Sequence, residues 1–586
     1  MKSQADKPRL TYEHSNKDGW GGHRILHRVF LCFLMALATL SSNALIAGAP
    51  TIQDACIDRN ARFDTGTIHI LVLNDRSEEY ELDSVSLTNV LWYRSIPSVI
   101  APYVTGEILI RLRQPVNKDI NVTLLDTKGN ELKVVARPRE LNASIKSVFF
   151  DEDLREVYIY VGSKQELPLP ESLLAGVGKN EVSHFNVIRS NDAKSMCIKA
   201  VFSRKLTQCE PVWIKIVLPD VGTLQAVVKA IGLFPISSWD GDTRQELSFD
   251  PAPFRKLYKP ENDTDLRLNR EKGPMPKAYE VLEDPSCKDC RKLYQIGGHG
   301  KQIVERIRTI ESLDPLHPTF IHICEWKKKY GYFAYAGITD IIFVNPYEIA
   351  FYPNKSGYDY YSGNPEMNGY FACLAKTANQ PRLLFTIPAA FNDKDKRTAR
   401  FPTPEELRLT VYSQLIAGSR GILYFTKGSK SGRGYEGNRR LKKEIGRLNK
   451  ELRSLRPLLR IADTFSVACS VNRPKIRYHA LLAGDLGILI IVINQDYKNS
   501  FSGLGRSFRY QPKSGVGLEI EKLHDLPLTD SIYVMGAKGV AETTNAESIG
   551  LRLERLDITA CILIPTPQGQ ELLKANPHNL FIELKK

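Results

Sequence analysis

Two adjacent carboxylates, Glu283 and Asp284, stand out in the middle of the chain. They follow a short apolar run over residues 278–282 and precede Pro285. Carboxyl groups donate or accept protons in general acid–base catalysis. Adjacent residues at a strand end point to different sides, so one of the two is expected to enter a pocket. The alternative interpretation is a loop in which Asp284-Pro285 only makes a turn.

Further polar and aromatic side chains follow later segments that read as strands. Aromatic rings stack on the faces of sugars, and amides bind hydroxyl groups, so the set predicts a carbohydrate-binding cleft. Taken one at a time, each of these residues is better explained by packing or capping, and only the set as a whole supports a cleft. The predicted binding residues are Glu325, Trp326, Asn345, Tyr347, Glu348, Phe391, Asn392 and Tyr424.

Residues 276–460, which contain all these positions, alternate between strand-like and helix-like segments. The strand-like segments are 278–282, 319–324, 339–344, 382–387 and 422–425, and Thr403-Pro404-Glu405-Glu406 reads as a capping box that opens a helix. Such alternation predicts βα units around a parallel sheet, here a (β/α) TIM-like barrel. About five units can be placed. The earlier ones are expected to be missing, very short or hidden in the polar, Pro-rich residues 235–276, so the barrel is expected to be shortened.

Both flanks of this region read as all-β. Residues 60–232 and 462–566 consist of short runs rich in Val, Ile, Leu and Tyr, separated by turn residues. The predicted fold class is therefore multidomain, α/β plus all-β. Its predicted domains are an N-terminal β-sandwich (60–232), the barrel-like domain (276–460) and a C-terminal β-sandwich (462–566).

Residues 1–49 are predicted to be an export signal or a membrane anchor. A basic stretch precedes an apolar run over residues 29–40, and Ser42-Asn43-Ala44 and Ala47-Gly48-Ala49 are small-x-small cleavage candidates. We therefore expect an exported protein, in the periplasm, cell envelope or medium. A membrane contact is expected only through this segment, if it stays uncleaved.

Composition and motifs exclude several other classes of protein. The chain has 586 residues, of which 42% are hydrophobic, so it can bury large cores. Its net charge of +14 fits an anionic partner. However, apolar positions along the basic helix over 439–460 mark a barrel helix with a solvated face, and no nucleic-acid partner is expected. Cys287 and Cys290 lack a second cysteine pair at matching spacing, so no metal is expected, and no phosphate or dinucleotide motif predicts a cofactor.

Several quoted stretches together resemble bacterial glycoside hydrolases that carry a sandwich ahead of a barrel. They are Trp213-Ile-Lys-Ile-Val-Leu-Pro219, Asp314-Pro-Leu-His-Pro318 and Pro404-Glu-Glu-Leu-Arg408, the last followed by Tyr412, Gly418, Arg420, Gly421 and Tyr424. Relatives, including substrate-assisted β-N-acetylgalactosaminidases, carry Asp-Glu-Pro at the end of the fourth barrel strand. Glu283-Asp284-Pro285 looks like that motif with the acids exchanged. The resemblance implies that this pair is catalytic and that the partner is a carbohydrate substrate.

Two functions remain open at this point. The first is a secreted glycoside hydrolase that acts on a polysaccharide or glycoconjugate. The second is a catalytically degenerate relative that binds carbohydrate or serves as a structural protein of the cell envelope. The exchanged acids favour the second, because Asp is one methylene shorter than Glu and errors of about 1 Å in position cost roughly 100-fold in rate. The oligomeric state is not predicted.

Overall fold

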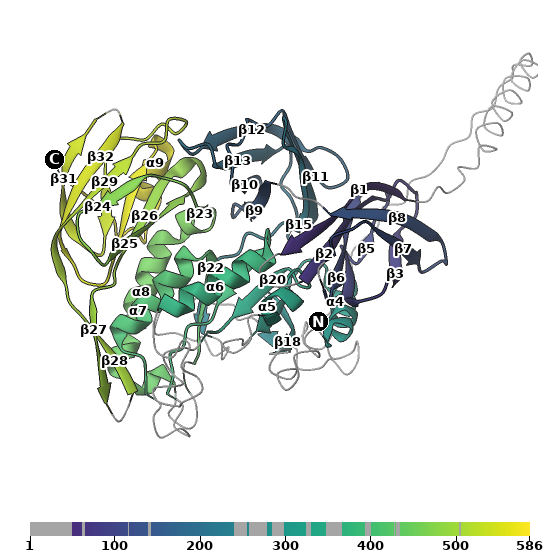
Figure 1. The fold of residues 1–586 in the computed structure, drawn as a ribbon. Coiled ribbons are helices and arrows are strands. Elements are labelled where there is room, and N and C mark those ends of the chain that lie inside the picture. Colours follow the sequence, from purple (N-terminus) through teal and green to yellow (C-terminus); the bar gives the residue numbers. More distant parts are fainter. Residues whose placement is uncertain are drawn as a thin grey trace, which may run out of the picture. The chain divides into compact units, whose positions relative to one another are not determined.

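In a computed structural model, residues 50–586 form one unit, separate from residues 1–49. The structure describes residues 50–60, 65–114, 116–138, 142–238, 255–256, 278–283, 298–323, 330–346, 366–392, 400–426, 428, 434–502, 505–545 and 547–585. Within this unit, antiparallel sheets occupy both ends of the sequence, and a parallel sheet with helices lies between them (Figure 1). The order of all-β, α/β and all-β regions predicted from the sequence is confirmed.

The N-terminal β-region is built around two separate apolar cores. Its first sheet has the order β4-β6-β2-β1-β8-β7-β3-β5. The strands are β1 (Thr51–Asn60), β2 (Thr65–Leu73), β3 (Tyr80–Ser86), β4 (Val90–Ile96), β5 (Val99–Ile100), β6 (Thr105–Leu112), β7 (Ile120–Asp126) and β8 (Glu131–Pro138). The chain turns at Asn89, whose φ of 63° is left-handed, and this turn separates β3 from β4.

The second core lies between a four-stranded sheet, β12-β13-β10-β9, and a three-stranded sheet, β11-β14-β15. The strands are β9 (Ala143–Phe150), β10 (Glu156–Ser163), β11 (Ser172–Gly176), β12 (Val182–Arg189), β13 (Ser195–Phe202), β14 (Pro211–Leu218) and β15 (Gly222–Lys229). Burial alternates along β14, as expected of a strand with one face on a core.

The central parallel sheet forms a half-barrel with the order β16-β22-β21-β20-β19-β18-β17. Its strands are β16 (Ile236–Ser238), β17 (Arg255–Lys256), β18 (Tyr279–Glu283), β19 (Thr319–Ile323), β20 (Ile341–Val344), β21 (Leu383–Thr386) and β22 (Ser419–Tyr424). The first strand in the chain pairs with the last, as at the seam of a (β/α) barrel. The early strands that the sequence left unplaced include β16 and β17, which have three and two residues.

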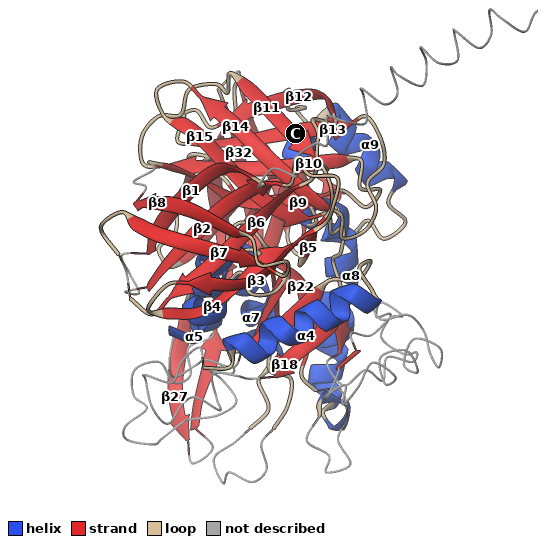
Figure 2. Ribbon diagram, turned by 90° about the vertical axis from the view of Figure 1, so that its right-hand side faces the viewer, coloured by secondary structure: helices blue, strands red, loops and turns tan. Residues whose placement is uncertain are grey.

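Helices cover the outer face of the half-barrel. They are α4 (Gly300–Leu313), α5 (Tyr330–Tyr335), α6 (Glu366–Asn379), α7 (Pro404–Ile416) and α8 (Arg439–Leu459). The capping box that opens α7 is confirmed, because Thr403 accepts from the Glu406 backbone and the Glu406 carboxylate accepts from the Thr403 backbone. Helix α4 also packs against β4 of the first sheet (Figure 2), where the Trp92 side chain covers Gly300.

The C-terminal region pairs a six-stranded sheet, β23-β25-β26-β33-β30-β34, with a four-stranded sheet, β24-β29-β32-β31. The six-stranded sheet contains β23 (Asp463–Thr464), β25 (Ile476–Leu482), β26 (Gly487–Asn494), β30 (Tyr533–Met535), β33 (Thr559–Pro565) and β34 (Ile582–Glu583). The four-stranded sheet contains β24 (Cys469–Val471), β29 (Lys513–Glu521), β31 (Lys538–Thr544) and β32 (Ser548–Leu556). Every residue of β26 is buried, as expected of a strand in the centre of a sheet.

Two further C-terminal elements were not predicted from the sequence. One is the hairpin of β27 (Tyr497–Ser502) and β28 (Gly505–Tyr510), which forms a separate two-stranded sheet. The other is helix α9 (Pro567–Ala575), which begins at Pro567 and is capped by the side chain of Thr566.

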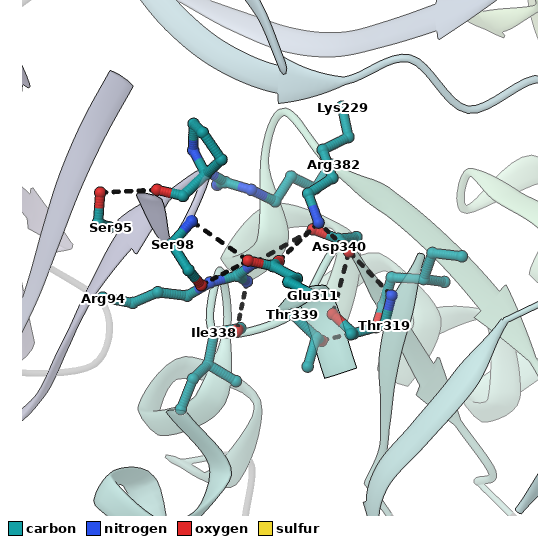
Figure 3. A network of polar contacts seen from close by, with 12 residues as sticks. Arg94, Ser95, Ser98, Lys229, Glu311, Thr319, Ile338, Thr339, Asp340 and Arg382 are labelled. Atoms are coloured by element: carbon teal, nitrogen blue, oxygen red, sulfur yellow. Dashed lines mark hydrogen bonds and ion pairs between the residues drawn. The ribbon is translucent and has the colours of Figure 1, made fainter. Parts of the chain in front are cut away.

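A buried network of charged groups joins the N-terminal sheets to the half-barrel (Figure 3). Lys229 of β15 contacts Glu311 of α4 at 2.6 Å and Asp340, which immediately precedes β20, at 3.1 Å. Arg94 of β4 contacts Glu311 at 2.6 Å. The amide and hydroxyl of Thr319 donate to Asp340 at the start of β19. The network therefore fixes the amino ends of the barrel strands, opposite the edge at which the predicted site residues lie.

The two carboxylates of this network are ionised despite their burial. Burial alone would raise the pKa of Asp340, but Lys229 and Arg94 outweigh it and bring that pKa to about 2. Glu311 has a lowered pKa for the same reasons. Lys229 is buried too, yet Asp340 and Glu311 raise its pKa. Each charge is thus balanced by the others, which is the condition for keeping charges inside a protein.

Candidate functional site

The concave face of the half-barrel is identified by the alternation of side chains along its strands. Ile321 of β19 and Ile342 of β20 belong to the cluster that contains helices α4 and α6. Phe320 and Phe343, at alternate positions, face the other way, with ring centroids 4.5 Å apart. The Phe343 ring contacts Phe385 of β21 at 5.1 Å in the same row. This aromatic row marks the inside of the half-barrel.

Two buried titratable residues within the strands, Glu280 and His322, lie on this concave face. Glu280 of β18 is in register with Phe320, and His322 of β19 is in register with Phe343. Residues in register on neighbouring strands share a face, so both side chains enter the interior. They are 3% exposed. Burial at this level is costly for such groups unless neighbouring polar groups compensate it.

Glu283, the predicted acid, is the last residue of β18 and pairs in register with His322. A shift in register between Glu280 and Leu282 accommodates both glutamates on the face of Phe320 and His322. The backbone therefore places Glu283 on the concave face, one level closer to the carboxyl edge than Glu280.

Asn345 follows β20 and lies at the next level toward the carboxyl edge. Ile341, Phe343 and Asn345 alternate along one face, so Asn345 continues the concave row. Its side chain is 2% exposed, and no hydrogen bond from the described residues reaches its Oδ1. A buried amide oxygen without such a bond is an acceptor available to a ligand group or a water molecule.

Phe391 and Asn392 lie at the same edge because β21 continues past its last ladder pair. The backbone of Ile387 donates to Val344, and Ala389 forms a parallel bridge with Phe425 after β22. Phe391 then packs edge-on against Phe425, with centroids 5.2 Å apart. The Oδ1 of Asn392 is buried without a hydrogen bond from the described part of the chain. Of the predicted binding residues, Asn345, Phe391 and Asn392 therefore lie at the same carboxyl edge of the half-barrel.

Tyr424 ends β22 but lies on the helix-facing side of that strand. Burial raises its pKa well above the usual value, and the nearest charges that act on it are those of Tyr435 and of Glu444 on α8. Arg420, four residues earlier in β22, donates to the carbonyl of Ala462 beyond α8. The structure therefore does not bring Tyr424 together with Asn345 and Asn392.

The remaining predicted site residues are not among those the structure describes. They are Asp284, Glu325, Trp326, Tyr347 and Glu348, and only the backbone of Glu283 is described. Their assignments remain predictions.

Sequence reasoning missed Glu280 and His322 because it looked for polar residues after strands and not within them. A signal was present. Tyr279–Glu283 and Thr319–Ile323 are apolar strands, each interrupted by one acid or imidazole at a position of alternate spacing. In a strand buried on both faces, such a residue has to point into the interior of the barrel or into the helix layer.

The described residues also bear on metal, thiol and membrane chemistry. Among the described residues, no three His, Cys, Asp or Glu side chains are grouped to hold a metal ion. Among the described cysteines, Cys197, Cys209, Cys469 and Cys561 are free thiols. The described helices include none that is long and apolar enough to cross a membrane.

No protein-family model and no curated protein matches this chain. Among solved structures, one described as a glycoside hydrolase matches 52% of this chain and 68% of its own, at 11% identity and a TM-score of 0.32. An FMN-binding β-glucuronidase from Facaelibacterium prausnitzii L2-6 matches 78% of this chain and 89% of its own, at 9% identity and a TM-score of 0.26.

A β-galactosidase from the psychrophilic Marinomonas ef1 matches 27% of this chain and 26% of its own, at 12% identity and a TM-score of 0.23. The chain therefore has a distant structural resemblance to glycoside hydrolases at low identity. At such TM-scores the resemblance concerns the general arrangement of strands and helices, and it assigns no role to any residue of this chain.

Proposed function

We propose that this protein acts on carbohydrate and cleaves a glycosidic bond at the carboxyl edge of the half-barrel. The observation that carries the proposal is the pairing of Glu283 with His322 on the concave face, one level above buried Glu280, with Asn345 at the same edge two strands away. Parallel barrels gather their reactive groups at this edge, because all strands end there on the same side.

In the proposed reaction, Glu283 is the general acid. It protonates the glycosidic oxygen as the bond to the leaving group breaks, while a second group stabilises the positive charge that develops on the sugar ring. A water molecule then adds to the anomeric carbon and gives a proton back to Glu283, which restores the acid. That second group is the acetamido oxygen in an N-acetylhexosaminide or a carboxylate such as Asp284 in other glycosides. Asn345 and Asn392 supply amide groups for sugar hydroxyls, and Phe391 supplies an apolar wall.

The test is hydrolysis of a panel of aryl glycosides, including N-acetylhexosaminides, by the wild type, Glu283→Gln and Asp284→Asn. Loss of the general acid is expected to lower turnover by about 100-fold or more. Glu305→Gln is the matched control, because Glu305 is exposed on the neighbouring helix α4. Thermal unfolding of each variant separates a loss of chemistry from a loss of fold.

Unchanged activity in both site variants would refute the assignment of the acid pair. The second candidate function, carbohydrate binding without turnover, predicts no hydrolysis by the wild type and retained binding of oligosaccharides. The small size of β16 and β17 favours this candidate. These two strands form the edges of the parallel sheet, and strands of three and two residues are too short to hold the sheet closed as a full barrel.

We also propose that residues 1–49 direct export, on the basis of the basic and apolar segments and the small-x-small sites in the sequence. Cell fractionation tests this proposal, and a pool confined to the cytoplasm would contradict it.

A further inference from the structure

A cleft opens between helices α7 and α8 and the C-terminal sheets, away from the strand-end acids Glu283 and Asp284 in sequence. It has a volume of about 630 Å³, which is within the range of small-ligand sites. Its walls come from the start of α7, one face of α8, strand β28 and the residues around β32 and β33. Figure 1 shows the β27–β28 hairpin extending beside these two helices.

The floor of the cleft is a closed group of charges. Arg408 of α7 contacts Glu444 at 2.7 Å and holds both oxygens of Glu451, at 2.8 and 2.9 Å. The Tyr412 hydroxyl also donates to Glu451 at 2.7 Å. Both carboxylates on the floor are thus bonded, and their two negative charges are balanced by Arg408 together with Arg447, which contacts Glu444 at 3.2 Å.

The rim of the cleft carries arginines with unused hydrogen-bonding capacity. Arg440 of α8 and Arg509 of β28 are exposed, and neither forms a hydrogen bond or ion pair with another described residue. Arg447 makes one contact to Glu444 at 3.2 Å while its side chain stays 62% exposed. Two acids also line the cleft: Asp557 is bonded to Arg555, whereas Glu405 is exposed.

We propose that this cleft binds the carboxylate groups of a uronic-acid-containing oligosaccharide. Arginine presents a planar fork of donors that fits a carboxylate with two parallel hydrogen bonds, and Arg440 and Arg509 offer such forks on different walls. Tyr510, half-buried in the lining, supplies an aromatic surface for a sugar ring, whereas Phe508 is buried and packs against Tyr497. The choice of a sugar rests on the proposed carbohydrate function, whereas the choice of a carboxylate rests on the arginines of the rim.

A nucleic acid fits the same cleft less well. A phosphate backbone carries a dense row of negative charges, and it would meet Glu405 and the carboxylate of Asp557 as well as the arginines. The carboxylates of a polyuronate are separated by whole sugar rings, which matches arginines that are interspersed with acids.

The experiment is calorimetric titration of the full chain with trigalacturonic acid and with its trimethyl ester. We expect the acid to bind and the ester to bind at least about tenfold more weakly, because the ester keeps the shape but lacks the charge. Arg440→Gln and Arg509→Gln are each expected to weaken binding of the acid by about tenfold or more. Arg439→Gln, a change of an exposed neighbour that does not line the cleft, is expected to change it less than twofold.

Equal binding of acid and ester, or equal effects of Arg440→Gln and Arg439→Gln, would overturn the inference. Tighter binding of a single-stranded DNA 20-mer, with loss of that binding in the same two variants, would also overturn it in favour of a nucleic-acid site. Binding of the acid without hydrolysis of any glycoside supports this cleft and contradicts only the proposed catalysis. Binding of neutral sugars without binding of the acid contradicts this cleft and leaves the proposed catalysis standing.

Discussion

At the scale of single residues, Lys376 shows how burial reshapes the chemistry of a side chain. It lies on α6 with 6% exposure, its Nζ 4.9 Å from the centroid of the Phe149 ring and 4.0 Å from Asp463. Burial lowers its pKa, Asp463 opposes the change, and Arg420 adds to it, with a result of about 8. This lysine is uncharged in part of the folded population under mildly alkaline conditions.

This shift predicts a stability that rises with pH. Between about pH 8 and 10.5 the unfolded chain keeps a proton on Lys376 that the folded protein has lost, so raising the pH favours folding. Over that interval, the free energy of unfolding of the wild type is expected to rise by about 3 kcal/mol relative to Lys376→Met. Urea unfolding of both proteins across this range measures it. Parallel pH profiles would show that Lys376 titrates normally.

At the scale of elements, helix α7 depends on the capping box at its start. Thr403 and Glu406 satisfy each other's backbone amides, and Arg400 holds the fully buried Glu406 carboxylate with two bonds of 2.7 Å. The helix lies between the half-barrel and the C-terminal sheets, and Thr403 at its start is half-buried, so the cap replaces hydrogen bonds that water would supply only in part.

Replacement of Thr403 by Ala is therefore expected to cost about 1 kcal/mol in the free energy of unfolding, the usual contribution of an N-cap side chain. Thr127→Ala, an equivalent change at an exposed turn, is expected to cost less than about 0.5 kcal/mol. Chemical denaturation of the two variants makes the comparison. Equal costs would mean that the cap hydrogen bond adds nothing at this position.

At the scale of the whole described unit, the network around Lys229 links the N-terminal sheets to the half-barrel. Lys229→Met would leave Glu311 and Asp340 with Arg94 as their remaining basic partner in the network. Removal of one member of a buried charged group typically costs about 3–5 kcal/mol, because the others stay buried without compensation. Thermal or urea unfolding should show this loss, while Lys194→Met, at an exposed position, should stay near the wild type.

The carboxylates of the same network set the direction of its pH dependence. The pKa of Asp340 is about 2 in the folded protein, below the value of 3.8 for an isolated side chain. The stabilisation by Asp340 is complete above about pH 3.8 and disappears as the pH falls through 2. Lys229→Met should therefore lose most of this acid sensitivity, and a variant as acid-sensitive as the wild type would argue against the network as its source.

The sequence by itself determined the elements whose signals are local. The capping box of α7 depends on residues within a few positions of each other, and it appears as predicted. The apolar run of β26 and the alternation along β14 are patterns of the same local kind. The succession of all-β, α/β and all-β regions follows from such signals, because the period of the apolar pattern distinguishes strands from helices. The predicted domain boundaries and the role of the acid pair remain predictions.

Only the tertiary structure decided which residues share a face or a cleft. The short strands β16 and β17 are held by pairing with β22 and β18, and two or three residues carry no strand signal of their own. Register between neighbouring strands placed Glu283 beside His322 on the concave face, and the position of α8 placed Tyr424 against the helices. Such placements depend on partners far away in the chain, which a local pattern of residues does not encode.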